Sequence, residues 1–502
     1  MNRSLTSGFL SLVSAKLATS LITIVSLPLI IRVLGAGDYG DYAFLISTFS
    51  LLMILISSGV TEGVQKFAAE ERDDPQWQAY VIGFYLKLAL VLAVGGAIIL
   101  ALITAEGTLP ALYGADFTLY FYLLAAFVIA AQFRSFSRRT MMAFGWERYS
   151  EPLRIFGKLV WVGLGLALAL QGLGVTAFLL SNIVAASLVA IGGFVLIFRR
   201  TSIRAVVSKR PTSFPTRKLL SFNALNIVLV LLLMSLFHVD VIMVRTLLSD
   251  QATGFYKGAL ALAEYIWFVP LSLQTLLLHS TSNDWIEDRT GRLTDLSTRI
   301  TRYVLLFTGL LAIGLFVLAG RVLPLYFGGP FAAAEVALLF LLPGSIGFAL
   351  ARPLYAINQS SGRLTPLIAA TGVAAIMNGL LNVVLIPQYG IAGAAAATSI
   401  GYGSMFVLHV GCARWLGYNP LVDIRFTRCL ATIGVTLPIL WIIDQSIDGD
   451  LIALLVVPPI GALLFTALAL LTGAIDRQEI RDIVGSLPQP IARPIQRFLP
   501  GA

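Results

Sequence analysis

The stretch FLSLVSAKLATSLITIVSLPLIIRVL, residues Phe9–Leu34, is long and apolar enough to cross a bilayer as one helix, for which about 20 residues suffice. It nevertheless carries Lys16 roughly 12 Å inside the membrane, at 1.5 Å of rise per residue. A lysine that faces lipid at such a depth costs about 2.5–3.5 kcal/mol. Thr19, Thr23 and Ser26 share the helical face of this lysine. We therefore expect the face to line a wet cavity that the rest of the chain completes.

The composition predicts a helical membrane protein with many spans. Of the 502 residues, 58% are hydrophobic and 12% are charged, whereas soluble domains contain about 25% charged residues. The net charge of +9 fits basic cytoplasmic loops better than nucleic-acid binding. Cys412 and Cys429 fall on the predicted cytoplasmic side, so we expect no disulfide. The sequence contains no metal-ligand cluster, nucleotide loop or catalytic triad, so we expect neither a cofactor nor enzymatic activity.

Apolar runs recur along the whole chain and predict an all-α fold with 14 transmembrane helices. The predicted spans lie near residues 8–34, 41–61, 80–104, 117–134, 153–171, 174–198, 219–240, 254–280, 302–320, 332–352, 366–387, 391–412, 428–445 and 451–472.

The basic residues predict the orientation. With the N-terminus inside, the predicted inside segments hold 28 of the 35 Lys and Arg residues, and the outside segments hold three: Arg245, Lys257 and Arg321. The other four lie within spans. Because cytoplasmic loops are enriched in Lys and Arg, we expect both termini in the cytoplasm and the protein in the cytoplasmic (inner) membrane.

The first six spans and the next six resemble two copies of one unit. At an offset of 214 residues, five positions match: Gly40 with Gly254, Tyr42 with Tyr256, Phe117 with Phe331, Arg138 with Arg352, and Pro152 with Pro366. After a slip of two residues, GVTAFLLSNI from Gly174 matches GIAGAAAATS from Gly390. Since six spans return the chain to its starting side, the two copies are predicted to be parallel repeats.

These matches predict two pseudo-symmetric six-helix lobes and two extra C-terminal helices. The predicted divisions are an N-lobe at 1–198, a cytoplasmic linker at 199–218, a C-lobe at 219–412, spans 13 and 14 at 413–472, and an amphipathic cytoplasmic tail at 473–502.

Several charged residues in or beside the spans are candidates for binding an anion. Lys16, Lys87 and Lys158 all lie roughly 9–12 Å from the cytoplasmic end of their spans, and an ammonium suits a phosphate or pyrophosphate. The alternative for Lys87 and Lys158 is snorkelling to the headgroups. Arg32, near the outer end of span 1, is equally suited to snorkelling. Arg138 and Arg352 end matched spans at the cytoplasmic mouth, where they either fix topology or capture an anionic headgroup.

Polar and acidic residues in the second half complete the candidates. Asn223 and Asn226 share a face of span 7, and Asn378 and Asn382 share a face of span 11; they either join helices or line a sugar-binding cavity. Glu264 lies near the middle of span 8 and either couples transport to a proton or monovalent cation or pairs with a lysine.

Asp240, at the outer end of span 7, is a second candidate for ion coupling or a simple end charge near Arg245.

The stretch NGLLNVVLIPQYGIAGAAAATSIGY, Asn378–Tyr402, resembles the eleventh and twelfth spans of polysaccharide-export flippases in the multidrug/oligosaccharidyl-lipid/polysaccharide transporter superfamily. RVLGAGDYGDYAFL from Arg32, GFYKGALAL from Gly254 and the run from Phe144 to Pro152 also resemble this family. The resemblance extends over essentially the whole chain. Its motifs are structural, so they indicate the family rather than the cargo.

The resemblance implies two six-helix lobes that give alternating access to a central cavity. It implies a flippase that moves a polyprenyl-linked oligosaccharide to the outer leaflet during glycan assembly, in concert with glycan assembly enzymes. By position, it assigns the phosphate-binding role to Lys16 and Lys87, and then to Lys158. A drug or cation antiporter of the same superfamily and a membrane glycan polymerase or ligase are the alternatives, but the first predicts twelve spans and the second needs larger outer loops.

Overall fold

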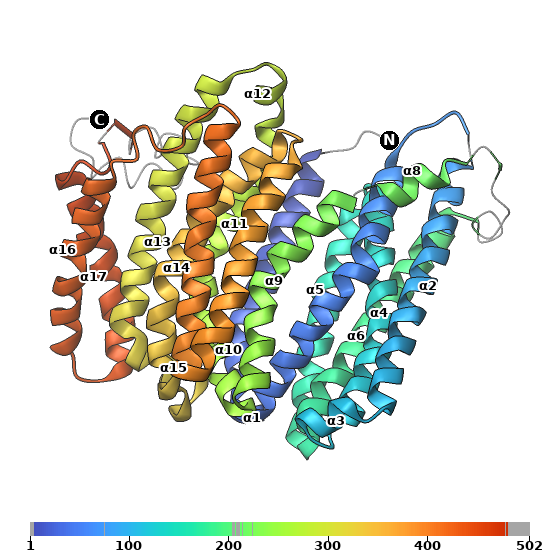
Figure 1. Cartoon of the computed structure of the whole chain (residues 1–502), viewed down its shortest axis with the longest axis horizontal. Coiled ribbons are helices and arrows are strands. Elements are labelled where there is room, and N and C mark those ends of the chain that lie inside the picture. The colour runs from blue at the N-terminus through green and yellow to red at the C-terminus, as the bar shows by residue number, and fades with distance from the viewer. Residues whose placement is uncertain are drawn as a thin grey trace. The chain divides into compact units, whose positions relative to one another are not determined.

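The computed structural model describes residues 5–74, 76–202, 206, 211–212, 214–222, 224–476 and 478–479, with side chains described from Ser14 onward. Every element of regular structure in these residues is helical (Figure 1). Eleven helical segments among them are long and apolar enough to cross a membrane. The prediction of an all-helical, multi-pass membrane protein is confirmed.

The chain forms two compact units, and unit 1 comprises Met1–Gly258 and Thr371–Ala397. Its helices are α1 (Leu5–Ala69), α2 (Trp77–Ala105), α3 (Thr108–Tyr113), α4 (Phe117–Ala143), α5 (Glu147–Leu168), α6 (Gly174–Arg200), α8 (Thr216–Ser221), α9 (Ala224–Leu247) and most of α10 (Asp250–Glu264). A π-helical turn, Ala169–Leu173, joins α5 to α6. Residues 371–397 of α15 (Leu364–Trp415) also belong to this unit.

Unit 2 comprises Ala259–Ala370 and Thr398–Ala502. It begins with the end of α10 and the 3-10 turn Tyr265–Trp267. Its further helices are α11 (Phe268–Ser280), α12 (Ser282–Ile286), α13 (Thr290–Phe327), the 3-10 turn Gly329–Ala334, α14 (Glu335–Ser360), the remainder of α15, α16 (Phe426–Gln445) and α17 (Asp450–Leu471). These units have other bounds than the lobes predicted at 1–198 and 219–412, and the lobes stay a prediction.

Three of the long helical segments are interrupted by glycine. The backbone leaves helical geometry at Gly35 (φ 75°, ψ 176°) in α1, at Gly172 and Gly174 between α5 and α6, and at Gly390 in α15. Positive φ is accessible to glycine without the steric cost that a Cβ adds. Each glycine lets the chain reverse within one or two residues, so two apolar runs follow one another without a loop.

Positions matched by the sequence repeat share their backbone geometry. Gly174 has φ 49° and ψ −129°, and Gly390 has φ 59° and ψ −138°. Gly114 and Gly328, which are 214 residues apart, have φ, ψ of 114°, 160° and 112°, 155°. Each of this second pair donates its N–H to a proline carbonyl four residues earlier, at 2.9 and 2.8 Å. The agreement supports an internal repeat on grounds independent of residue identity.

Several helices extend past the predicted spans. The span expected at 117–134 continues to Ala143, and the one expected at 302–320 starts at Thr290. The added turns carry polar and basic side chains, which do not stop a helix. Apolarity therefore predicts that a helix exists but not where it ends.

The segment predicted as a linker at 199–218 is partly built into unit 1. Val206 and Phe214 are buried, and the Phe214 ring lies 5.5 Å from Trp77 and 5.8 Å from Phe84. A Cβ on Gly83 in α2 would lie 2.0 Å from the Val206 carbonyl oxygen, so the backbones approach closely. The predicted amphipathic tail at 473–502 lies almost entirely outside the described residues.

Candidate functional site

Lys16 lies on the sheltered face of α1. Its side chain is half-buried, whereas Leu17 and Leu21 beside it are exposed. Thr19 and Thr23 donate their hydroxyl groups to backbone carbonyls one turn earlier, each at 2.8 Å. The polar stripe predicted from the sequence therefore points away from the exposed apolar face, and its threonines satisfy their hydroxyl donors within the helix.

The other predicted cations occupy different surroundings. Lys87 in α2 is exposed on a face that it shares with Leu90 and Val91, which are also exposed. Arg32 in α1 is exposed beside Val33. Lys158 in α5 is half-buried, and its Nζ lies 4.0 Å from the centroid of the Trp161 ring.

Lys158 and Trp161 belong to a chain of contacts inside unit 1 that continues through Phe178 and Tyr42 to Asn182. We call these five residues the mid-bundle cluster. The Phe178 ring lies 6.0 Å from Trp161 and 5.7 Å from Tyr42. Asn182 donates to the Tyr42 hydroxyl at 2.9 Å. Lys158 lies eleven residues into α5, or about 16 Å along the axis. An ammonium, aromatic faces and an amide thus meet far from either helix end.

A second cluster joins α4 to α5. Arg138 donates to Glu151 at 3.1 Å, and Arg154 approaches the other oxygen of the same carboxylate at 3.1 Å. The Glu151 side chain is only 1% exposed, whereas those of Arg138 and Arg154 are 24% and 32% exposed. One buried carboxylate therefore holds two arginines whose side chains are partly exposed. We call these three residues the arginine clamp.

A neighbouring pair of contacts ties α1 to α4 and α9 at the same end of unit 1. Arg139 donates to the Gln65 amide oxygen at 2.6 Å, and Asn226 donates to Glu62 at 3.0 Å. The amide of Asn226 thus joins two helices, which is the commoner of the two uses expected for it. Asn223 lies outside the described residues. Helices α1 and α4 end here, and α5 and α9 begin here (Figure 1).

The remaining asparagine and acidic candidates are mostly buried. Asn378 and Asn382 are buried in α15, and neither amide atom of Asn382 has a hydrogen-bond partner among the described residues. Asp240 is fully buried and accepts from the Tyr256 hydroxyl at 2.5 Å. Glu264 is half-buried at the end of α10, where the helix passes into a 3-10 turn.

Arg352, which the sequence predicts at the cytoplasmic mouth, is buried. Its guanidinium lies 4.9 Å from the Phe348 ring and 5.7 Å from the Tyr355 ring.

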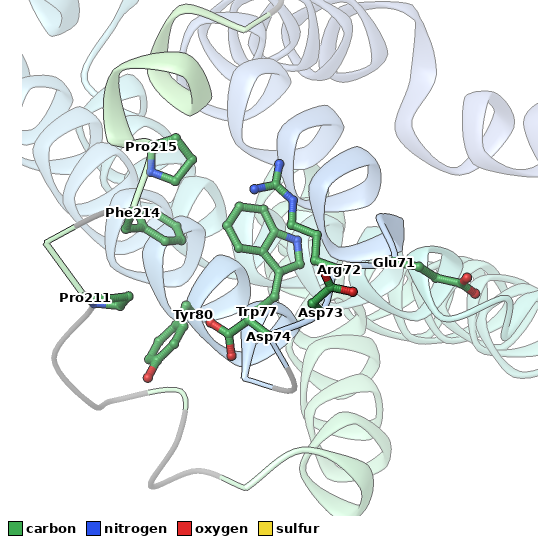
Figure 2. Close-up of a pocket in the computed structure, with 9 residues that line it drawn as sticks. All are labelled: Glu71, Arg72, Asp73, Asp74, Trp77, Tyr80, Pro211, Phe214 and Pro215. Atoms are coloured by element: carbon green, nitrogen blue, oxygen red, sulfur yellow. The ribbon is translucent and has the colours of Figure 1, made fainter.

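A polar cavity of about 450 Å³ opens between the α1–α2 connection and the linker segment. Figure 2 shows Trp77 at its centre, with Arg72 on one side and Phe214 on the other. The Arg72 guanidinium lies 3.7 Å from the Trp77 ring, and the Trp77 indole N–H donates to the Phe67 carbonyl at 2.9 Å. Glu71, Asp73 and Asp74 complete the acidic part of the wall. The ring contact between Phe214 and Trp77 fixes the linker beside the start of α2.

Sequence reasoning missed Glu62, Glu151 and the mid-bundle aromatics. Glu151 precedes Pro152 in a loop-like run, so it reads as a surface charge. Only its distance from Arg138, thirteen residues earlier and one helix away, reveals their ion pair. Glu62 stands at the end of an apolar run and gives no sign of its partner Asn226, 164 residues later.

Comparisons with known proteins give consistent results. A family model described as polysaccharide biosynthesis protein matches residues 5–269, more than half of the chain. The probable low-salt glycan biosynthesis flippase Agl15 of Haloferax volcanii is 23% identical over 470 residues, which cover 91% of this chain and 94% of that protein.

Solved structures share the fold. The lipid II flippase MurJ in an inward closed conformation matches with a TM-score of 0.74 at 13% identity, over 92% of this chain and 98% of that one. A multidrug resistance MATE family transporter of the MOP superfamily, in an inward-facing conformation, matches with a TM-score of 0.65 at 15% identity, over 82% and 96%. These relatives are flippases and transporters, which agrees with the prediction that the chain is not an enzyme.

Proposed function

We propose, since this chain belongs to the polysaccharide biosynthesis protein family, that it is a flippase for a polyprenyl-(pyro)phosphate-linked oligosaccharide. The cargo crosses from the cytoplasmic to the outer leaflet by alternating access, and glycan assembly enzymes act before and after it. The named activity of the Haloferax relative and the fold shared with MurJ support this assignment.

We propose 14 spans, with both termini in the cytoplasm and the protein in the cytoplasmic (inner) membrane. Eleven apolar helical segments are described, and dividing three of them at Gly35, at Gly174 and at Gly390 gives fourteen. An even number of spans returns the chain to its starting side. The excess of Lys and Arg in the inside segments supports a cytoplasmic start. The arginine clamp then lies at the cytoplasmic end of unit 1.

The observation that carries the proposal is the arginine clamp. Two guanidinium groups share one buried carboxylate, which leaves a net positive charge. Because Glu151 lies beneath its partners, an approaching anion meets the guanidinium groups rather than the carboxylate. Arginine binds phosphate oxygens in a bidentate manner, so the clamp suits the phosphate that joins lipid to sugar.

The mid-bundle cluster suits the next stage of the transfer. A phosphate that leaves the clamp meets half-buried Lys158 deeper in the bundle, where the half-buried Trp161 ring beside it suits contact with a sugar. Lys16 on the sheltered face of α1 supplies a further cation. Successive positive groups thus attract the cargo inward, and none of them needs to bind it tightly.

An export assay tests the proposal. In cells lacking the native gene, the double variant Arg138→Gln, Arg154→Gln should reduce surface glycan at least tenfold, because each lost phosphate contact costs about 1.5–3 kcal/mol. Lipid-linked precursor should accumulate in parallel. Immunoblots of membrane fractions establish that the protein is present.

The control is Arg148→Gln, which makes the same type of substitution at an exposed position in the first turns of α5. It should export within twofold of wild type. Wild-type export by the double variant would refute the clamp as a headgroup site. Normal glycan export in a strain without the gene would refute the flippase function itself.

A further inference from the structure

Among the residues that the structure describes, Arg352 is a buried charge without an ion-pair partner. Its residue is 6% exposed, and among the described residues neither Nε nor Nη1 has a hydrogen-bond partner. The surrounding contacts are the ring faces of Phe348 and Tyr355. A guanidinium stays protonated in proteins, so its charge is retained in this apolar setting. Buried charges normally have a counter-charge, and one is missing from the described contacts.

The matched arginine in the first copy of the repeat does have a counter-charge. Arg138, which matches Arg352 at the offset of 214, forms an ion pair with Glu151. The position that matches Glu151 at the same offset is Thr365, which has no charge. The second copy therefore keeps the arginine and lacks the carboxylate that neutralises it in the first.

His409 adds two further unpaired nitrogens beside this arginine. It is fully buried, and among the described residues neither ring nitrogen has a hydrogen-bond partner. Its ring lies 5.5 Å from the Tyr355 ring, so His409 and Arg352 contact the same aromatic side chain. Its main chain is held by Asn358, which donates to the His409 carbonyl at 3.2 Å. At the two-residue slip, the matching position in the first copy is Gly193, so the imidazole belongs to the second copy alone.

We propose that Arg352 and His409 bind a small monovalent anion of chloride size inside unit 2. The guanidinium supplies the charge and the N–H donors of Nε and Nη1, and an imidazole N–H supplies another donor. Unpaired buried polar groups in native proteins are commonly satisfied by an ordered ion or water, and here four nitrogens without partners among the described residues belong to two side chains that contact one ring. The burial of both side chains excludes a sugar headgroup. The site is therefore separate from the proposed cargo path and does not depend on it.

Thermal unfolding of the purified full-length protein, free of cargo, tests the site. Chloride is titrated against gluconate at constant ionic strength, because gluconate is too large for an enclosed site. The unfolding midpoint should rise saturably, by about 3 °C at a hundredfold excess over Kd. Inorganic phosphate should not replace chloride. Equal midpoints of the wild-type protein in chloride and gluconate would overturn the proposal.

Two variants assign the effect to this site. Arg352→Gln should abolish the chloride-dependent rise, and it should unfold at a higher temperature than wild type in gluconate because it removes an uncompensated charge. Arg148→Gln, which removes an exposed arginine outside both proposed anion sites, is the control and should keep the full rise. If Arg352→Gln does not fold, His409→Gln should weaken chloride at least threefold. A full chloride response in every folded variant of Arg352 and His409 would refute the assignment.

Discussion

Gly40 in α1 and Gly254 in α10 lie against one another inside unit 1, and their contacts are reciprocal. A Cβ on Gly40 would lie 1.9 Å from the Asp250 carbonyl oxygen, and a Cβ on Gly254 would lie 1.9 Å from the Ala36 carbonyl oxygen. Ala36 and Asp250 are themselves 214 residues apart. Such exchange of equivalent contacts is the geometry of a two-fold axis. The two sequence copies therefore meet here through matched residues.

Alanine at either glycine should destabilise this contact. The added methyl group meets a backbone carbonyl that cannot rotate away, so α1 and α10 must separate. We expect Gly40→Ala and Gly254→Ala each to cost at least about 2 kcal/mol, seen as a lower midpoint of thermal unfolding. Gly95→Ala is the control, because a Cβ there meets nothing within 4 Å. Midpoints for Gly40→Ala that equal those for Gly95→Ala would contradict the close contact.

Alanine substitutions at Gly174 and Gly390, where two helices join without a loop, distinguish the cost of backbone strain from the cost of steric contact. Gly390 has open space around its missing Cβ, whereas a Cβ on Gly174 would lie 2.5 Å from an Asp38 carboxylate oxygen. Gly390→Ala should therefore cost only the strain of positive φ, about 1–3 kcal/mol. Gly174→Ala should cost more, and the added replacement Asp38→Ala should recover the difference. If that replacement recovers nothing, the carboxylate is not the source of the extra cost.

Lys16 and Lys87 should differ in their effect on export. Lys16 lies on the sheltered face of α1, while Lys87 lies among exposed apolar side chains of α2. We expect Lys16→Ala to reduce surface glycan at least tenfold, because a cation on the cavity face meets the cargo phosphate. Lys87→Ala should reduce it less than threefold. Equal amounts of both proteins in the membrane are the control, and the reverse order of effects would refute this division of roles.

The sequence predicts the helices and their repeat because both follow from apolarity and chain reversal, which are local properties. Gly174 and Gly390 are recognisable in advance, since each stands where two apolar runs meet without a polar loop. Pairs such as Asn226 with Glu62 are not recognisable, because helix rotation decides which polar residues meet across 164 positions.

The burial of a charged side chain cannot be predicted from the sequence either, because it too depends on helix rotation. Arg138 and Arg352 match in the sequence, yet Arg138 has a carboxylate partner and Arg352 lies beside two aromatic rings.

Glu264 is the proposed coupling group, and Glu264→Gln tests it. The side chain is half-buried where α10 ends in a 3-10 turn, a break at which a protonation change can alter helix packing. In proteoliposomes, wild-type transport should change with the imposed proton or sodium gradient. The amide variant should transport at one rate under all gradients, because it neither binds a proton nor carries charge.

Glu106→Gln, an exposed residue after α2, is the matched control and should keep the gradient dependence. A Glu264→Gln protein with the full gradient dependence would exclude Glu264 and leave buried Asp240 as the next residue to replace, because it is the other acidic candidate among the described spans.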